Sequence, residues 1–397
     1  MTARVVVLGM HRSGTSCVGE LLAAMGAYFG PPGMGTGGTI ENPHGLFERK
    51  DLRQLCHFIL QQARAEWWAT SRLSPDRVPA AAWARADEML APILADLDAH
   101  EPWFIKEPRL CILLPMLRAH FGNVVAICVW RDPLEVAESL WTRDAIPIAF
   151  GAALWERYVR ASFAAGVPGA IISYNRLIAD PEGTTRQLLE DLTRLGVTGL
   201  HMPDARQLAH AVDPALHRSR PRQREVTEIL AVSQRRLLAA LETGNPADPE
   251  LARPLSAEQM AKLAALEEAR RQQMKAAAYR SLAEARKRRA AVPMLTRMRE
   301  IGSALRYVPC NPAQWHKWHR RGKFRRRLRQ HLEACAIAAG GAFDSNWYVK
   351  RYPDVAASKA DPLMHFVRYG AAEGRDPSPA CPTSRHLHVM LGGAAPA

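Results

Sequence analysis

The chain has 397 residues, 48% of them hydrophobic, which suffices for one large domain with attachments or for two domains. Its net charge of +14 lies in the C-terminal part: residues 1–220 hold 22 Lys and Arg against 23 Asp and Glu, whereas residues 221–397 hold 31 against 16. The sequence has no long apolar run, which argues against a spanning helix. It also has no signal-peptide stretch and no C-x-x-C pair among its seven cysteines, which argues against a disulfide-rich secreted fold and a cysteine zinc site.

Over residues 1–220, short apolar runs alternate with longer amphipathic runs, which is typical of strands that alternate with helices. The predicted buried strands are Arg4–Met10, Trp103–Ile105, Val124–Trp130 and Ala170–Tyr174. The predicted helices are Thr15–Met25, Leu46–Ala65, Ala80–Ala99, Leu110–Phe121, Pro133–Trp141, Ala149–Ala165 and Pro181–Leu195. Such alternation predicts the α/β class, with a doubly wound, mostly parallel sheet and helices on both faces.

The strand signal stops near residue 221, and charged helices are predicted over Glu225–Leu241 and Ser256–Ala291. We therefore expect an α/β domain over residues 1–220, followed by regions of different composition. These are a charged helical region over 221–300, a basic helical segment with aromatic residues over 301–342, a small helical C-terminal module over 343–380 and a flexible tail over 381–397.

Residues 9–16 read G-M-H-R-S-G-T-S, which matches the phosphate-binding loop G-x-x-x-x-G-K-[ST] except that Thr15 replaces the lysine. A strand, a turn and a helix start make an anion site, because the helix N-terminus presents free N–H groups and a partial positive charge. Gly14 allows close approach of a ligand, and Arg12 adds a cation. Hydroxyl donors come from Ser13, Thr15 and Ser16. Without the lysine a triphosphate is poorly neutralised, so a less charged ligand, bound without a metal, suits this loop better.

The motif M-H-R-S-G-T-S resembles the 5′-phosphosulfate loop of the sulfotransferase superfamily, and in particular of its bacterial carbohydrate-type enzymes. The resemblance covers about residues 4–220 and implies a P-loop-type fold related to nucleotide kinases. It also implies the co-substrate 3′-phosphoadenosine 5′-phosphosulfate (PAPS), with no metal expected, and places residues 12–16 at the donor. A donor without a γ-phosphate accounts for the missing lysine.

The superfamily binds the 3′-phosphate of the donor with an arginine at a strand end and a serine eight residues later. Arg131 follows the predicted strand Val124–Trp130, and Ser139 lies at that spacing in R-D-P-L-E-V-A-E-S. The carboxyl end of a strand delivers the guanidinium to the crevice, and the next helix brings the hydroxyl round two turns later. Alternatively, Arg131 forms an i,i+4 pair with Glu135 on the surface.

Sulfuryl transfer is expected to depend on positioning and on a cation where charge builds on the leaving oxygen. Lys106 in F-I-K-E-P-R is the candidate catalytic cation, because the segment resembles the K-D-P segment of the tyrosylprotein branch, with Glu107 in place of Asp. Arg12 could share this role, and the nearby Arg109 could hold an acidic acceptor or the donor. Lys106 could instead form a surface ion pair.

A base is expected because the acceptor must lose a proton. Residues 42–48, N-P-H-G-L-F-E, resemble the N-P-x-G-[FY]-[FW]-E segment of bacterial carbohydrate-type sulfotransferases. The resemblance makes Glu48 the candidate catalytic base, with Glu41 and His44 as alternatives. Glu48 could instead be a carboxylate that interacts with the dipole at the start of a helix.

Tyr174, in I-S-Y-N-R-L-I-A-D-P-E, resembles the tyrosine of the superfamily segment Y-E-x-L-x-x-D-P. The resemblance implies that Tyr174 lines the donor site, although a place in the core is equally compatible with the pattern. Asn175 stands where the family has Glu, so the salt bridge that the family forms there is not expected.

The run Lys317–Arg329 holds eight Lys and Arg in thirteen residues, interleaved with aromatic residues. It favours an anionic membrane surface or an acidic glycan as a partner, rather than nucleic acid, although a solvated face is the alternative. We expect a cytoplasmic protein, at most peripheral to the inner face of a membrane. The segment Phe343–Pro379 resembles a small module found on bacterial polysaccharide glycosyltransferases, and its aromatic side chains are expected to form mainly its core.

Together these features predict a PAPS-dependent sulfotransferase that acts on a hydroxyl of a carbohydrate, either a bacterial polysaccharide or a glycolipid. Two alternatives remain open at this level. The same fold could belong to a magnesium-dependent kinase that uses a nucleoside triphosphate, or the chain could be a non-catalytic, glycan-associated scaffold.

Overall fold

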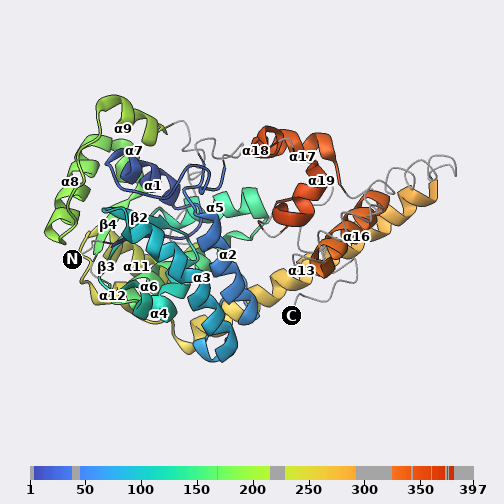
Figure 1. Ribbon diagram of the computed structural model, residues 1–397. Coiled ribbons are helices and arrows are strands. Elements are labelled where there is room, and N and C mark those ends of the chain that lie inside the picture. The colour runs from blue at the N-terminus through green and yellow to red at the C-terminus, as the bar shows by residue number, and fades with distance from the viewer. Residues whose placement is uncertain are drawn as a thin grey trace. The chain divides into compact units, whose positions relative to one another are not determined.

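The computed structural model describes residues 4–37, 45–167, 169–214, 229–291, 324–340, 343–358, 360–371, 373 and 375–379. The described residues up to Arg270 form one compact unit, and those from Arg271 onward form another. The first unit contains the sheet, and its core positions the candidate site (Figure 1).

Four short apolar runs form one sheet in the order β2-β1-β3-β4, in which every neighbouring pair is parallel. The strands are β1 (Arg4–Leu8), β2 (Trp103–Lys106), β3 (Val124–Trp130) and β4 (Gly169–Ser173). Val7 of β1 pairs with Lys106 of β2 and with Ile127 of β3. The residues that follow β1, β2 and β3 therefore leave the sheet at one edge, its carboxyl edge, where α/β proteins bind ligands.

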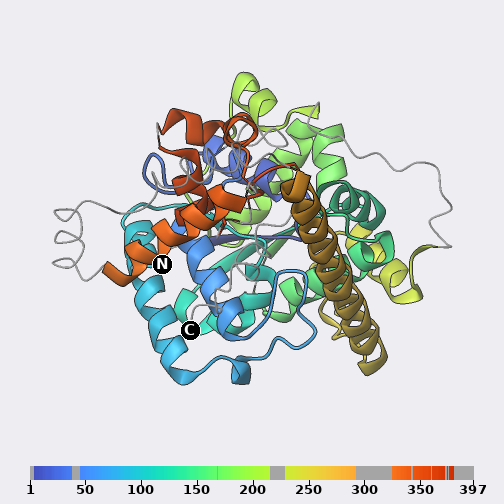
Figure 2. The same cartoon turned by 90° about the vertical axis from the view of Figure 1, so that its right-hand side faces the viewer.

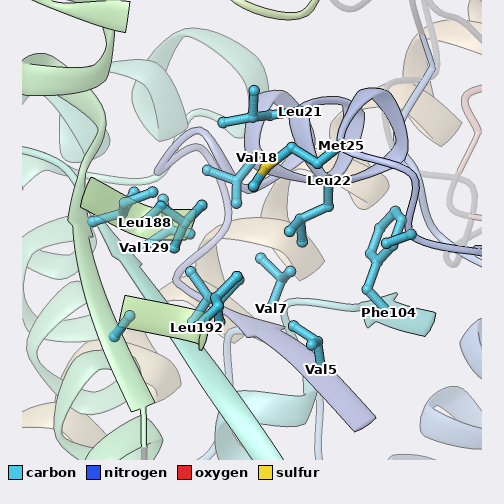
Figure 3. Packing of buried hydrophobic residues seen from close by; sticks show 14 of the residues in the cluster. Val5, Val7, Val18, Leu21, Leu22, Met25, Phe104, Val129, Leu188 and Leu192 are labelled. Carbon is cyan, nitrogen blue, oxygen red and sulfur yellow. The ribbon is translucent and has the colours of Figure 1, made fainter. Parts of the chain in front are cut away.

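Both faces of the sheet are covered by helices, as its near-continuous apolar strands require. On one face lie α1 (Thr15–Ala24), α8 (Pro181–Arg194) and α9 (Ala205–Ala211), and on the other lie α4 (Leu110–Phe121) and α6 (Ile148–Ala164) (Figure 1). Figure 3 shows Val5 and Val7 facing Val18 and Leu22 of α1, with Leu192 of α8 beside them. Val6 and Leu8 are fully buried and alternate with these residues, so they face the opposite layer.

The remaining helices of the first unit flank this sandwich. They are α2 (Lys50–Gln62), the 3₁₀ turn η1 (Pro75–Arg77), α3 (Ala80–Asp98), α5 (Pro133–Asp144), α7 (Tyr174–Ala179), α11 (Val232–Glu242), α12 (Pro249–Ala252) and the first part of α13 (Ala257–Ala291). α13 is one unbroken helix (Figure 2). Both α11 and α12 pack on α6, so the unit that contains the sheet extends beyond residue 220, where the charge pattern predicts a boundary.

The second unit is helical among its described residues. It contains α16 (Phe324–Gly340), α17 (Ser345–Arg351), α18 (Pro353–Ala357), α19 (Pro362–His365) and the π-helical turn η3 (Phe366–Gly370). Tyr348, Tyr352 and Phe366 are buried, together with Ala334 and Ile337 of α16. Aromatic side chains thus form the core of the module, as expected from the sequence, and the C-terminal half of α16 belongs to that core.

The predicted α/β class, with a parallel sheet and helices on both faces, is confirmed. The predicted helix Leu46–Ala65 is too long, because residues 46–49 are not helical. Arg49 forms an antiparallel bridge with Gly35, and the Thr36 N–H donates to the Glu48 carbonyl at 2.9 Å, so α2 begins only at Lys50. Tyr174, predicted as the end of a strand, is instead the first residue of α7, whose start is capped by the Ser173 hydroxyl.

Candidate active site

The loop between β1 and α1 folds as a tight turn with a geometry that suits an anion. The Ser13 N–H donates to the Met10 carbonyl at 3.1 Å, and both Arg12 (φ 72°) and Gly14 (φ 88°) are left-handed. No described side chain caps the start of α1, so the N–H groups of its first turn keep their capacity for a ligand. The Ser13 hydroxyl is fully buried and has no hydrogen-bond partner among the described residues. A buried polar atom of this kind has room in its bonding for a water molecule or a ligand.

Two glycines let other groups approach this loop closely. A Cβ on Gly14 would lie 2.1 Å from the Tyr174 ring, so the ring packs directly against the loop and only glycine fits there. A Cβ on Gly9 would lie 2.5 Å from the Val129 carbonyl oxygen. The Gly9 N–H donates to the thiol of Cys111 at 3.0 Å; burial raises the pKa of that thiol to about 11, so it is neutral at neutral pH.

The two predicted phosphate motifs meet in the structure. Arg12 Nε donates to Ser139 Oγ at 2.8 Å across 127 residues of sequence. Arg131 Nη1 lies 3.4 Å from the Arg12 carbonyl oxygen, and its guanidinium lies over the Tyr174 ring at 5.2 Å from the centroid. Arg12, Arg131, Ser139 and Tyr174 therefore surround one place beside the N-terminus of α1.

Arg131 also forms the i,i+4 pair with Glu135, but this pair is buried rather than on the surface. Its Nε donates to Glu135 Oε2 at 2.6 Å, and the two residues are 6% and 3% exposed. Asn175 donates to the other oxygen of Glu135 at 2.8 Å. The asparagine that departs from the family pattern thus holds the carboxylate that orients Arg131. The i,i+4 spacing was the only sequence signal for Glu135, and it did not reveal the burial of the pair.

Lys106 extends from the end of β2 to the start of α1. Its Nζ donates to Ser16 Oγ at 3.2 Å, to the Leu46 carbonyl at 2.9 Å and to Glu48 Oε1 at 2.9 Å, and the residue is 2% exposed. A neighbouring strand therefore supplies a lysine to the loop that lacks one at Thr15. Glu48, the candidate base, is the buried partner of this ammonium group and also lies 3.4 Å from Arg53 Nε.

Arg109 is engaged by Glu107, which is fully buried. Arg109 Nε donates to Glu107 Oε1 at 2.7 Å and Nη2 donates to Oε2 at 2.8 Å, a bidentate arrangement. Burial alone would raise the pKa of Glu107, but the Arg109 guanidinium outweighs burial and lowers that pKa to about 2. Arg109 therefore braces the turn after Lys106 through its pair with Glu107.

His11 belongs to the same site, although no sequence signal assigned it a role. Its ring packs against Trp67 at 4.7 Å and Tyr158 at 6.0 Å between centroids. Burial, together with the nearby Arg143 guanidinium, lowers the pKa of His11 well below 6.5, so the imidazole is neutral at neutral pH. Its Nε2 atom is buried and has no hydrogen-bond partner among the described residues.

Several predicted residues lie outside the described residues: the alternative bases Glu41 and His44, residues 317–323 of the basic run, and the predicted tail 381–397. Within the described ranges, no group of three or more His, Cys, Asp and Glu side chains could hold a metal ion. No helix in the same ranges is both long and apolar enough to cross a bilayer.

Comparison with known proteins places this site in a family. The model of the Sulfotransferase family matches residues 4–194, from the start of β1 to the end of α8. No curated protein matches the chain. One similar solved structure is the sulfotransferase domain from the Synechococcus PCC 7002 olefin synthase, with 18% identity, coverage of 66% of this chain and 93% of that chain, and a TM-score of 0.32. Residues 4–194, which hold every described candidate side chain of the site, therefore match the sulfotransferase family.

Proposed function

We propose that this sulfotransferase domain uses PAPS as its donor and transfers the sulfuryl group to a hydroxyl of a carbohydrate. The observation that carries the donor assignment is the contact of Arg12 Nε with Ser139 Oγ at 2.8 Å. It joins a loop suited to a 5′-phosphosulfate with a strand-end arginine and a helix serine suited to a 3′-phosphate. The buried Ser13 hydroxyl and the start of α1, which have no side-chain partner among the described residues, add donors for the same anion.

The side chains at the end of β2 support the transfer step. In the proposed reaction, the acceptor oxygen forms a bond to sulfur while the bond between sulfur and the bridging oxygen breaks. The electron pair leaves with 3′-phosphoadenosine 5′-phosphate (PAP), and Lys106 stabilises the charge that develops on that oxygen. Glu48 takes the acceptor proton. Because that proton neutralises Glu48, its attraction for Lys106 weakens at the moment when the leaving oxygen needs the cation.

The carbohydrate acceptor is proposed from sequence resemblance. Residues 42–48 resemble a segment of bacterial carbohydrate-type sulfotransferases, and the C-terminal module resembles one found on polysaccharide glycosyltransferases. A bacterial polysaccharide or a glycolipid suits both resemblances. We further propose that the basic run Lys317–Arg329 binds an anionic membrane surface or an acidic glycan, which would keep the enzyme near such acceptors.

Titration calorimetry with PAP, adenosine 5′-phosphate and ATP tests the donor assignment. We expect PAP to bind at least about tenfold tighter than adenosine 5′-phosphate, because charge-assisted hydrogen bonds contribute about 1.5–3 kcal/mol each. Ser139→Ala should reduce this preference, whereas Thr142→Ala, an exposed position on the same helix, should keep it. Tighter binding of ATP with magnesium than of PAP would favour the kinase alternative instead.

The same preparations test the transfer step with labelled PAPS and cell-surface glycan. Arg12→Ala should abolish transfer, and Lys106→Met should lower it about a hundredfold while PAP binding persists. Lys106→Met removes the buried partner of the Glu48 carboxylate and could destabilise the fold. The double variant Lys106→Met/Glu48→Gln removes both charges and so controls for this loss of stability. Full transfer by Arg12→Ala would refute the site. Nucleotide binding without transfer to any glycan would favour the scaffold alternative.

A further inference from the structure

Glu267, on α13, is a buried carboxylate that lies outside the residues matched by the family model. Its Oε1 accepts hydrogen bonds from the N–H groups of Thr70 at 2.7 Å and Ser71 at 2.8 Å, and its Oε2 accepts one from the Ser71 hydroxyl. The side chain is 1% exposed, so these bonds form away from water. Loss of the carboxylate would leave the buried Thr70 N–H and the partly buried Ser71 N–H without their acceptor, which costs more than the loss of an exposed hydrogen bond.

The loop that Glu267 holds carries a tryptophan against the phosphate loop. Glu66 and Ala69 exchange backbone hydrogen bonds at 3.2 and 3.0 Å, which closes a tight turn around Trp67. The Trp67 carbonyl accepts a hydrogen bond from the Tyr158 hydroxyl at 2.6 Å, and its ring packs on His11. His11 directly precedes Arg12, so the Trp67 ring abuts the backbone segment that presents the donor-binding groups.

We infer that Glu267 is a positioning residue of the sulfuryl-transfer site. It fixes residues 66–71 and, through Trp67 and His11, holds the phosphate loop in the shape that binds the donor. The start of α13 is then part of the catalytic unit, although it lies more than 60 residues beyond the end of the matched family region at residue 194. For its effect on donor binding, this inference rests on the proposed function.

The test compares Glu267→Ala and Glu267→Gln with wild type in the full chain. For Glu267→Ala we expect faster amide hydrogen exchange in residues 66–71 and also in residues 9–16, with β3 unchanged, and PAP binding weakened about tenfold. Glu267→Gln should restore most of the affinity, because both N–H bonds are made to one oxygen, Oε1, which glutamine retains. Glu258→Ala, at an exposed position in the first turn of α13, is the matched control and should change neither measurement.

A second variant separates the proposed chain of contacts from a general loss of stability. Trp67→Leu keeps the backbone bonds to Glu267 but removes the ring contact with His11, so we expect slow exchange at residues 70–71, fast exchange at residues 9–16 and weaker PAP binding. If either variant loosens only residues 66–71 and leaves residues 9–16 and PAP affinity unchanged, Glu267 merely anchors α13 and the inference is overturned. If wild type binds no PAP, the proposed function fails, and exchange in residues 9–16 alone decides the inference.

Discussion

The side chains of the site hold one another in place before any ligand is bound. Arg131 is oriented by Glu135, which is held in turn by Asn175, and Lys106 is held by Glu48. Buried pairs of this kind add little net stability, but removal of one partner leaves an uncompensated charge. They instead provide preorganisation, because the cations need not reorganise when charge develops on the leaving oxygen.

Gly14 offers a test of the fit between the loop and Tyr174. Gly14→Ala should abolish PAP binding, since the new methyl would lie 2.1 Å from the ring and the residue has φ 88°. Gly196→Ala is the matched control, because Gly196 has φ 87° and a Cβ there would meet no atom within 4 Å. This variant therefore has only the cost of backbone strain, about 1–2 kcal/mol. Calorimetry with PAP and thermal unfolding of both variants distinguish the two costs. Equal losses in both variants would show that the contact with Tyr174 is unimportant.

His11 predicts a specific dependence of stability on pH. Its pKa in the folded protein lies below 6.5, so the unfolded chain binds more protons there and stability falls as pH decreases below about 6.5. His11→Phe keeps a ring against Trp67 and cannot be protonated, so urea unfolding should show a smaller loss between pH 7 and pH 5 than in wild type. Glu107, with a pKa lowered from 4.5 to about 2, adds a separate loss only below about pH 4.5. An unchanged slope in His11→Phe would contradict the assignment.

Among the elements, most strands and most helix starts could be predicted because they depend on local signals. Asp132 caps α5, for example, and Pro133 follows it at the first helical position; the Asp132 Oδ1 accepts from the N–H groups of Leu134 and Glu135 at 2.8 and 3.1 Å. The short helix α7 was missed because six residues carry too little periodicity to separate from the strand before them.

The site itself could be predicted only where a motif names the residue. The positions of Arg12, Arg131, Ser139 and Lys106 follow from the two phosphate motifs and a strand end. Their partners do not follow, because each contact depends on which strands are neighbours. The Ser16 contact of Lys106, for example, spans 90 residues and exists because β2 pairs with β1. Likewise, the contact of Glu267 with Thr70 spans 197 residues and carries no local signal.

At the scale of the whole molecule, the family region depends on the helices that follow it. Arg160 of α6 is 4% exposed, and its guanidinium donates to Glu156, to the Glu250 carboxylate and carbonyl, and to the carbonyls of Ser233 and Arg253. Most acceptors of this buried cation therefore come from residues beyond the α/β boundary that the charge pattern predicts at residue 220. The charged composition of residues 221–270 thus reflects, in part, their role as a cover for α6.

Truncation tests this dependence. A chain that ends at residue 220 should be insoluble or unfold at a much lower temperature than one that ends at residue 291, because Arg160 would lose several charge-assisted bonds of about 1.5–3 kcal/mol each. That loss is comparable with the net stability of a domain, about 5–15 kcal/mol. Thermal unfolding with and without PAP measures the difference. Equal melting temperatures for the two chains would show that α11 to α13 are dispensable.

Lys106, the proposed catalytic cation, lies at the end of β2. β2 is one of the two outer strands of the sheet, and among the described residues its free side is bridged only by Tyr28, through Trp103. Outer strands open more readily than central ones, and the anion turn lies on the inner strand β1. Transient opening of β2 would move the Lys106 ammonium group away from the site while the nucleotide stays bound to the loop after β1. The protein would then pass through a state that binds the nucleotide but does not catalyse transfer. On heating, sulfuryl transfer should therefore be lost at a lower temperature than nucleotide binding.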